Sequence, residues 1–248
     1  MNALEIQDVA VSFGGVHAVN GVSLELAQGE RRVILGPNGA GKTTLFNMIG
    51  GQIQPDRGSI RMFGQELIPL TSYNRAHLGL ARTFQVTTLF SSLTVEENIR
   101  LAIQAFSLSR YQILQPANAF DEIVDRVNAS LAEWRFESER SVKVSDLSYG
   151  EQRKLEIAMA LAHQPRLLLL DEPTAGLSTL ETEKVVALIK TLSRDVTLVA
   201  IEHDMDVAFE IGERFTIMNQ GQVLVEGPAD VIRNNPEIQA IYFGEDAL

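Results

Sequence analysis

A nine-residue segment near the N-terminus constrains the fold of this chain more than any other. Residues 36–44 read Gly-Pro-Asn-Gly-Ala-Gly-Lys-Thr-Thr and match G-x-x-x-x-G-K-[ST], the pattern of a phosphate-binding loop. The short segment 32–35 before it, apolar except for Arg32, predicts a buried strand, and residues 44–49 after it predict a helix. A glycine-rich turn formed by chance is the alternative, but this order of strand, loop and helix favours the phosphate-binding loop.

The residue types in this loop suit the phosphates of a nucleotide. The glycines let several backbone N–H groups point at phosphate oxygens, and the N-terminus of the following helix adds partial positive charge. We expect the Lys42 ammonium to reach the β- and γ-phosphates and the Thr43 hydroxyl to ligate Mg²⁺. The predicted nucleotide-binding residues are Gly36, Pro37, Asn38, Gly39, Ala40, Gly41, Lys42, Thr43 and Thr44.

The composition limits the kinds of partner and chemistry. The 248 residues include 21 Lys and Arg against 32 Asp and Glu, a net charge of −11, which argues against nucleic acid as the main partner. The chain has no cysteine, which excludes disulfides, thiolate zinc sites and a cysteine nucleophile. We see neither a signal peptide nor an apolar run near the about 20 residues that span a bilayer. We therefore expect a soluble protein that reaches a membrane only through a partner.

The order of the predicted elements indicates an α/β fold. Alternating apolar and polar residues at 4–11, 22–26 and 59–63 predict a small antiparallel β layer. The last third alternates strands and helices, which favours a mainly parallel sheet with helices on both faces. Its predicted strands are 167–170 and 197–201, its helices are 152–163, 181–192 and 204–210, and a hairpin joins 214–218 to 222–226.

The middle of the chain predicts a helical region. Apolar residues at helical spacing predict one buried face of a helix, following an expected loop at 107–118. The residues of this face are Phe120, Ile123, Val124, Val127, Leu131 and Trp134.

Four further features could complete a nucleotide site. Asp171 ends an apolar strand, where its carboxylate could hold Mg²⁺ through water, and Glu172 could orient or deprotonate a water attacking the γ-phosphate. Ser148 and Glu151 form S-x-x-E, a capping box whose helix N-terminus could also meet the γ-phosphate of a second nucleotide. His203, after strand 197–201, and Gln85 gain a role only if they lie near the loop. The simpler reading of each is structural or incidental.

Taken in order, these segments resemble the ATP-binding subunit of an ABC transporter over nearly the whole chain. The resemblance implies that residues 36–43 are the Walker A motif, 147–152 the signature motif and 167–171 the Walker B motif. It implies catalytic roles for Glu172 and His203. It assigns metal contacts to Thr43, Gln85 and Asp171, and nucleotide contacts to Phe13, Gln85, Ser148 and Gly150 besides the loop. Phe13 would stack on adenine, and a core position in the β layer is the alternative.

Three residues depart from the usual motifs of the family. Tyr149 stands where the signature has Gly, Glu151 where it has Gln, and Ser178 where the D-loop, at residues 175–178, often ends in Asp. Residues 81–85, 89–90 and 93–98 resemble the branch that serves branched-chain amino acids, urea and short amides. The C-terminal residues 232–245 also resemble subunits that extract lipopolysaccharide, so an exporter of that type remains the alternative.

The resemblance implies one ABC domain over residues 1–248, with an α/β P-loop NTPase core, a mainly parallel sheet and an N-terminal antiparallel β layer. Residues 1–86 and 153–248 would form this core, 87–152 an inserted helical subdomain with the signature motif, and 227–248 a C-terminal tail. The implied cofactors are ATP and Mg²⁺.

The implied partners are transmembrane permease subunits, a second ATP-binding subunit, identical or paralogous, and an extracytoplasmic solute-binding protein, with no nucleic acid. The implied location is the cytoplasmic face of the inner membrane. We expect permease docking near Gln85 and residues 86–93, against the alternative that this segment packs on the core. A soluble ABC protein and a non-hydrolysing binding module are the remaining alternatives.

Overall fold

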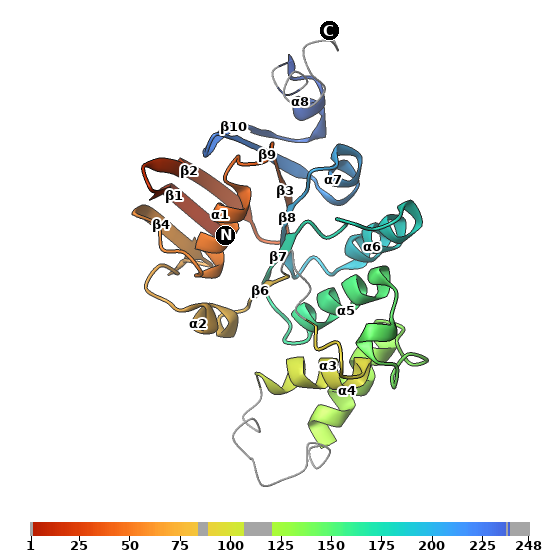
Figure 1. The fold of residues 1–248 in the computed structure, drawn as a ribbon. Helices are drawn as coiled ribbons and strands as arrows, with labels where there is room; N and C mark the ends of the chain where they lie inside the picture. Colours follow the sequence, from red (N-terminus) through yellow and green to blue (C-terminus); the bar gives the residue numbers. More distant parts are fainter. Residues whose placement is uncertain (1, 84–88, 107–120, 237, 239–248) are drawn as a thin grey trace.

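The computed structural model describes residues 2–83, 89–106, 121–236 and 238. Figure 1 shows two β-sheets at one end of the molecule and a group of helices at the other. The predicted helix position Phe120, the predicted loop 107–118 and Gln85 lie outside the described residues.

The smaller sheet is the antiparallel layer predicted from the alternating pattern. Its strand order is β2-β1-β4-β5, and β1 pairs antiparallel with both β2 and β4. Paired residues of neighbouring strands point to the same face of the sheet, so Ile6 is buried together with its partners Leu24 and Ile60. The strands are β1 (Asn2–Phe13), β2 (Val16–Ala27), β4 (Arg57–Met62) and β5 (Gln65–Glu66).

The larger sheet carries the phosphate-binding loop. Its order is β10-β9-β3-β8-β7-β6; the neighbours from β9 to β6 run parallel, and β10 pairs antiparallel with β9 as the predicted hairpin. The apolar strands β3, β7 and β8 are buried throughout, as their composition predicts. The strands are β3 (Arg31–Leu35), β6 (Leu80–Arg82), β7 (Leu167–Asp171), β8 (Thr197–Ile201), β9 (Arg214–Asn219) and β10 (Gln222–Gly227).

Helices lie on both faces of the larger sheet, as predicted, but one face is covered by a helix together with the antiparallel sheet. Ile34, Leu167 and Leu169 point to a core shared with the antiparallel sheet and α1 (Lys42–Gly50). The neighbouring Val33 and Leu168 point to the helices of the opposite face. An antiparallel sheet can cover that face because its inward side chains form a continuous apolar surface. The helices on the other face are α5 (Tyr149–Leu161), α6 (Thr179–Thr191) and α7 (Met205–Ile211).

The helical region is built from α3 (Val95–Gln104), α4 (Asp121–Glu133) and the middle of α5. Helix α4 buries Ile123, Val127 and Leu131, the face predicted from the sequence, whereas Val124 is only partly buried. The short elements are α2 (Ser72–His77), the 3₁₀ helix η3 (Val144–Asp146) and α8 (Ala229–Arg233). None of the helices in the described ranges has the length and apolar character needed to cross a membrane.

Candidate functional site

The phosphate-binding loop lies at the carboxyl end of β3, where it forms one wall of a cavity of about 570 Å³. Ligands of open α/β sheets bind at this edge. The cavity is lined by the loop residues 38–44, by the start of β2, and by Glu172 and Gln220. The loop follows β3, and the catalytic candidate Glu172 follows β7. Because β8 alone lies between these two strands in the sheet, the loop and Glu172 reach the same cavity.

Helix α1 begins without a side-chain cap. Its N-cap is Gly41, whose φ of 97° is left-handed, and no side chain of that residue can accept from the first turn. A Cβ on Gly41 would collide with the carbonyl oxygen of Ala18 on β2, so only glycine fits. Helices α3, α5 and α7, in contrast, are capped by Thr94, Ser148 and Asp204. The N–H groups in the first turn of α1 therefore lie at the cavity wall and have no side-chain acceptor from the N-cap residue.

The Lys42 side chain is held inside the loop. Its Nζ donates to the carbonyl oxygens of Gly36 at 2.6 Å and Pro37 at 3.0 Å. Burial lowers the pKa of Lys42, and the nearby Glu172 and Asp171 partly oppose this shift. The ammonium is thus oriented by the loop that it is predicted to serve.

The Asp171 carboxylate ends β7 in a buried position. Its Oδ2 accepts from Nη2 of Arg82 at 2.9 Å, while Oδ1 is buried and has no hydrogen-bond partner among the described residues. Burial raises the pKa of Asp171, against the opposing effect of the Arg82 guanidinium. The sequence did not single out Arg82, because its role depends on the pairing of β6 with β7.

These oxygens fit a magnesium ion. Mg²⁺ in phosphate sites is held by one or two protein oxygens together with phosphate and water oxygens. The unpaired Oδ1 of Asp171 and the exposed Thr43, which lines the cavity, supply such oxygens. No group of three or more His, Cys, Asp or Glu that could hold a metal occurs within the described ranges. An ion at this site would thus depend on the phosphates of the nucleotide.

Glu172 occupies a strained turn directly after β7. Its φ is 47°, which is uncommon for a residue with a side chain, and its N–H donates to the carbonyl oxygen of Ile201 at 3.0 Å. The side chain is half-buried and lines the cavity. The turn thus directs the carboxylate toward the predicted nucleotide position.

Ser148 and Gly150 lie apart from this cavity. They line a separate hollow of about 580 Å³ between α5 and α6. The capping box predicted from the sequence is present: Glu151 N–H donates to Ser148 Oγ at 3.3 Å, and Ser148 N–H donates to Glu151 Oε2 at 2.9 Å. The Gly150 N–H donates to Oε1 of Glu181, on α6, at 3.1 Å.

The three departures from the usual motifs each have a structural partner. Glu151 completes the capping box of α5. The ring of Tyr149 lies beside Gly176, close enough that a Cβ there would be 3.3 Å from it. Ser178 donates through its N–H, at 3.0 Å, and its Oγ, at 2.6 Å, to Glu181 Oε2. Glu181 therefore joins the starts of α5 and α6.

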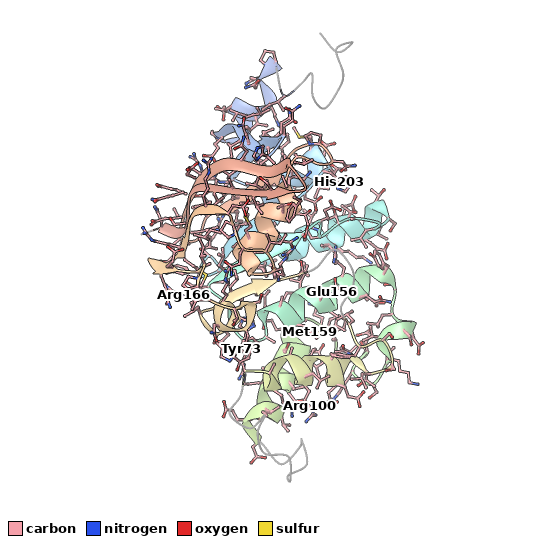
Figure 2. The ribbon with its side chains drawn as sticks, turned by 60° about the vertical axis from the view of Figure 1, so that its left-hand side comes forward. Tyr73, Arg100, Glu156, Met159, Arg166 and His203 are labelled. Atoms are coloured by element: carbon pink, nitrogen blue, oxygen red, sulfur yellow. The ribbon has the colours of Figure 1, made fainter. Side chains whose placement is uncertain are left out.

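The remaining candidates are placed as follows. Phe13 ends β1 with half of its surface exposed, so the alternative of a core position was wrong, and its pairing partner Val16 lines the cavity. His203 is exposed just beyond β8 and is not among the cavity-lining residues. Figure 2 shows His203 in the upper half of the view, whereas Arg100, on α3 of the helical region, lies toward the lower end.

Glu202, the acidic residue directly after β8, is a site residue that no sequence pattern singled out. It is fully buried, and burial raises its pKa to about 7. Its Oε1 accepts from the N–H of Thr174 at 3.3 Å and from its hydroxyl at 3.0 Å, whereas Oε2 is unpartnered in the described part of the chain. Glu202 thus anchors the end of the turn that carries Glu172.

Glu202→Gln is expected to change how stability depends on pH. Because the pKa of Glu202 rises on folding from 4.5 to about 7, its protonated form stabilises the fold below pH 4.5, and this contribution is lost as pH rises through 7. The variant keeps an acceptor for Thr174 but cannot ionise. Relative to wild type, its free energy of unfolding should rise by up to about 3 kcal/mol between about pH 5 and pH 8. Urea unfolding of both proteins checks this, and a pH-independent difference would contradict it.

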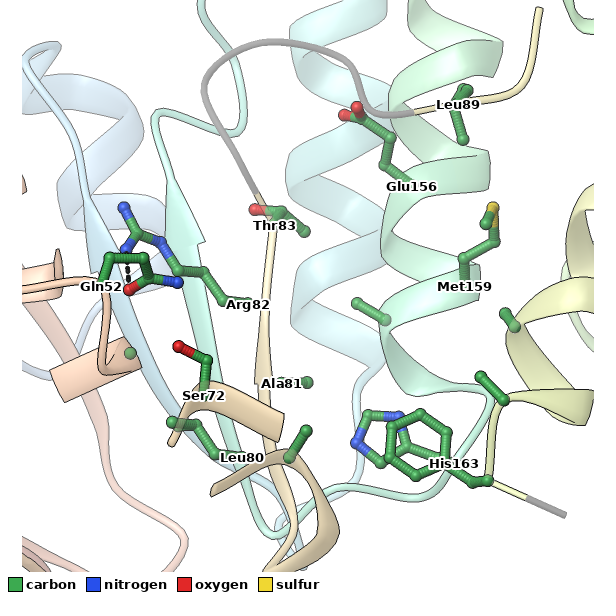
Figure 3. A pocket seen from close by; sticks show the side chains of 16 residues that line it. Gln52, Ser72, Leu80, Ala81, Arg82, Thr83, Leu89, Glu156, Met159 and His163 are labelled. Atoms are coloured by element: carbon green, nitrogen blue, oxygen red, sulfur yellow. Dashed lines mark hydrogen bonds between the residues drawn. The ribbon is translucent and has the colours of Figure 1, made fainter. Parts of the chain in front are cut away.

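A second cavity, of about 310 Å³, lies between β6 and the helices α3 and α5 (Figure 3). Glu156 and Met159 of α5 lie across it from Thr83, whereas the Arg82 side chain points away from them, toward Gln52. At its other end the ring of His163 stacks on Phe106 with centroids 4.1 Å apart, and burial lowers the pKa of His163 to about 4. This groove is therefore lined mainly by apolar and uncharged groups, with Glu156 and Arg82 at one end.

Comparison with known proteins agrees with this geometry. The family model described as ABC transporter matches residues 19–175. The chain is 39% identical over 249 residues to the high-affinity branched-chain amino acid transport ATP-binding protein LivG of Salmonella typhimurium, covering 98% of each chain. It is 38% identical over 251 residues to the corresponding protein BraF of Pseudomonas aeruginosa, again covering 98% of each.

Solved structures are similar over the same length. An ATP-binding cassette of an ABC transporter in its ADP conformation superimposes with a TM-score of 0.85 at 26% identity, covering 99% of this chain and 100% of that one. A dimeric cassette in a post-hydrolysis state bound to ADP and Pi gives 0.75 at 28% identity, covering 91% and 98%. The chain therefore belongs to the ABC transporter family and is one of its ATP-binding cassette ATPases.

Proposed function

We propose that this ATPase powers an importer of branched-chain amino acids or related small amino acids and amides. The relatives LivG and BraF, whose names state branched-chain amino acid transport, support this over a lipopolysaccharide exporter or a soluble ABC protein. The resemblance of residues 81–85, 89–90 and 93–98 to that branch agrees. Permease subunits and a solute-binding protein would supply the membrane passage and the solute specificity.

The active unit in this proposal is a dimer of cassettes arranged head to tail. The observation that carries it is the separation, within one chain, of the phosphate-binding cavity from the hollow of Ser148 and Gly150. A nucleotide held by Lys42 and the loop would meet Ser148 and Gly150 of the opposite subunit. ATP would then close the dimer because its γ-phosphate binds both halves, and hydrolysis would release them.

Within each site the residues of this chain have distinct tasks. Lys42 and the N–H groups of α1 would bind the phosphates, and Phe13 would stack on adenine. Thr43 and Asp171, with Gln85, would hold Mg²⁺, which when bound neutralises charge on the phosphates. Glu172 would accept a proton from the attacking water or orient it, and His203 would contact the γ-phosphate.

The groove between β6, α3 and α5 is the proposed docking site for a cytoplasmic segment of the permease. It is bordered by Leu89, and the neighbouring Phe90 is 53% exposed, as an apolar docking surface requires. Of the residues predicted for docking, Gln85 and 86–88 lie outside the described residues, and the groove is lined by Thr83 and Leu89 on either side of residues 84–88.

Ala105→Glu is expected to uncouple this ATPase from its membrane partner. Ala105 is exposed and lines the groove, so a carboxylate there would place a charge against a docked apolar segment. Co-purification with the permease and solute uptake by proteoliposomes should fall at least about tenfold, with ATP affinity of the isolated chain unchanged. Ala132→Glu, an exposed position on α4, is the matched control. Undiminished co-purification of the groove variant would contradict this docking site.

A further inference from the structure

One buried arginine connects the signature helix to the turn that carries Glu172. Arg153 lies one turn into α5 and is 3% exposed. Its Nη2 donates to the carbonyl oxygens of Glu172 at 2.6 Å and Asp171 at 3.4 Å, and its Nε donates to that of Pro173 at 3.1 Å. A single planar guanidinium thus contacts three consecutive carbonyl groups.

The same guanidinium is fixed from its other side. Its Nη1 forms an ion pair with Oε2 of Glu156 at 2.6 Å, and Glu156 is 7% exposed. Glu156 borders the groove between β6, α3 and α5. Buried ion pairs seldom add net stability, because the desolvation of both charges offsets their attraction. We therefore attribute this ion pair to the position in which it holds the guanidinium rather than to any stability that it adds.

The turn held by Arg153 has a demanding conformation. Glu172 has a φ of 47°, and such a conformation persists only where the surroundings determine it. Ile201 accepts from the Glu172 N–H, and Glu202 accepts from Thr174, so β8 and the residue after it hold the turn from the sheet. Arg153 donates to the carbonyl groups of the same turn and so holds it from the opposite side, where the helices lie. Movement of α5 would therefore be transmitted to the main chain of Glu172.

We propose that Arg153 is a positioning residue for hydrolysis, which sets the main chain of Glu172 from the signature helix. It does not contact the nucleotide; it acts through the placement of the Glu172 carboxylate. This proposal rests on the proposed role of Glu172. Within one chain, Arg153 would also link the start of α5 to Glu172. Ser148 and Gly150 at that start would meet the nucleotide of the opposite subunit, whereas Glu172 acts on the nucleotide of its own subunit.

The test is a double-mutant cycle of Arg153→Met and Glu172→Gln, with nucleotide affinity and turnover measured in each variant. Arg153→Met should keep the nucleotide Kd and lower kcat per binding site about 10- to 100-fold, with KM little changed. In the Glu172→Gln background it should lower the residual rate no further. Arg153→Lys, which keeps the charge but loses the planar fork, should show a smaller loss and serves if the Met variant does not fold. Lys190→Met, which removes an exposed cation on α6 that lines neither the phosphate-binding cavity nor the hollow of Ser148 and Gly150, is the matched control.

Three results would overturn the proposal. They are unchanged kcat in both Arg153 variants, a loss of kcat only in proportion to lost binding sites, and an equal fold loss in wild-type and Glu172→Gln backgrounds. If Glu172→Gln itself keeps wild-type turnover, the proposed role of Glu172 fails and the role of Arg153 fails with it. A slow Glu172→Gln variant beside a fast Arg153→Met variant overturns the role of Arg153 alone.

Discussion

Glu172→Gln is expected to stop turnover while ATP stays bound. Gln keeps the size of the side chain but cannot accept a proton, and a positioned general base contributes about 10²- to 10⁴-fold to a rate. Phosphate release should therefore fall at least about 100-fold, with the ATP Kd within about twofold of wild type. Because unhydrolysed ATP would keep binding both halves, the dimer should accumulate, as light scattering after gel filtration with Mg·ATP would detect.

The control for this variant is Glu183→Gln, an exposed position on α6. It removes the same charge outside the cavity and should keep wild-type turnover. Wild-type turnover in Glu172→Gln would show that another group activates the water. Monomeric protein in the presence of ATP, with hydrolysis stopped, would separate the catalytic role from the proposed closure of the dimer.

Lys42→Ala is expected to weaken the binding of ATP and ADP strongly. The variant loses the ammonium that donates to Gly36 and Pro37 in the loop, together with its proposed contacts to the β- and γ-phosphates. Charge-assisted hydrogen bonds contribute about 1.5–3 kcal/mol each, so the loss of two corresponds to at least about a 100-fold weaker Kd. Isothermal titration with ATP and with ADP measures this, and AMP, which lacks both phosphates, should not distinguish the variant from wild type.

Lys143→Ala, an exposed lysine outside the cavity, is the control for charge alone. Wild-type ATP affinity in both Lys42→Ala and Lys143→Ala would remove the basis for the nucleotide site. An equal loss in both variants would instead indicate long-range attraction of the nucleotide, which higher salt would weaken.

The sequence predicted the parts of the fold and site that depend on neighbouring residues. The loop of residues 36–44, the apolar strands β7 and β8 and the capping box at Ser148 each show their pattern within a few positions. The arrangement of Asp171 beside the loop followed from the rule that parallel strands end at one edge. These predictions required no knowledge of distant contacts.

The parts that the sequence left open depend on contacts between distant segments. Arg82 and Asp171 are 89 residues apart and meet because β6 pairs with β7. Glu202 gives no sign in the sequence that it is buried, because an acidic residue after a strand is usually exposed. The antiparallel sheet itself was predicted, but not that it covers one face of the larger sheet together with α1. Alternating strands and helices predict the parallel sheet but not which elements cover it.

The left-handed Gly41 at the start of α1 has a consequence for the folded state as a whole. Helices α3, α5 and α7 each have a serine, threonine or aspartate that accepts from the first turn, whereas the N-cap of α1 offers no such side chain. A nucleotide bound as we propose would supply these acceptors through its phosphates and would bind the folded chain only. The free energy of unfolding should then rise with the concentration of free ATP or ADP relative to its Kd.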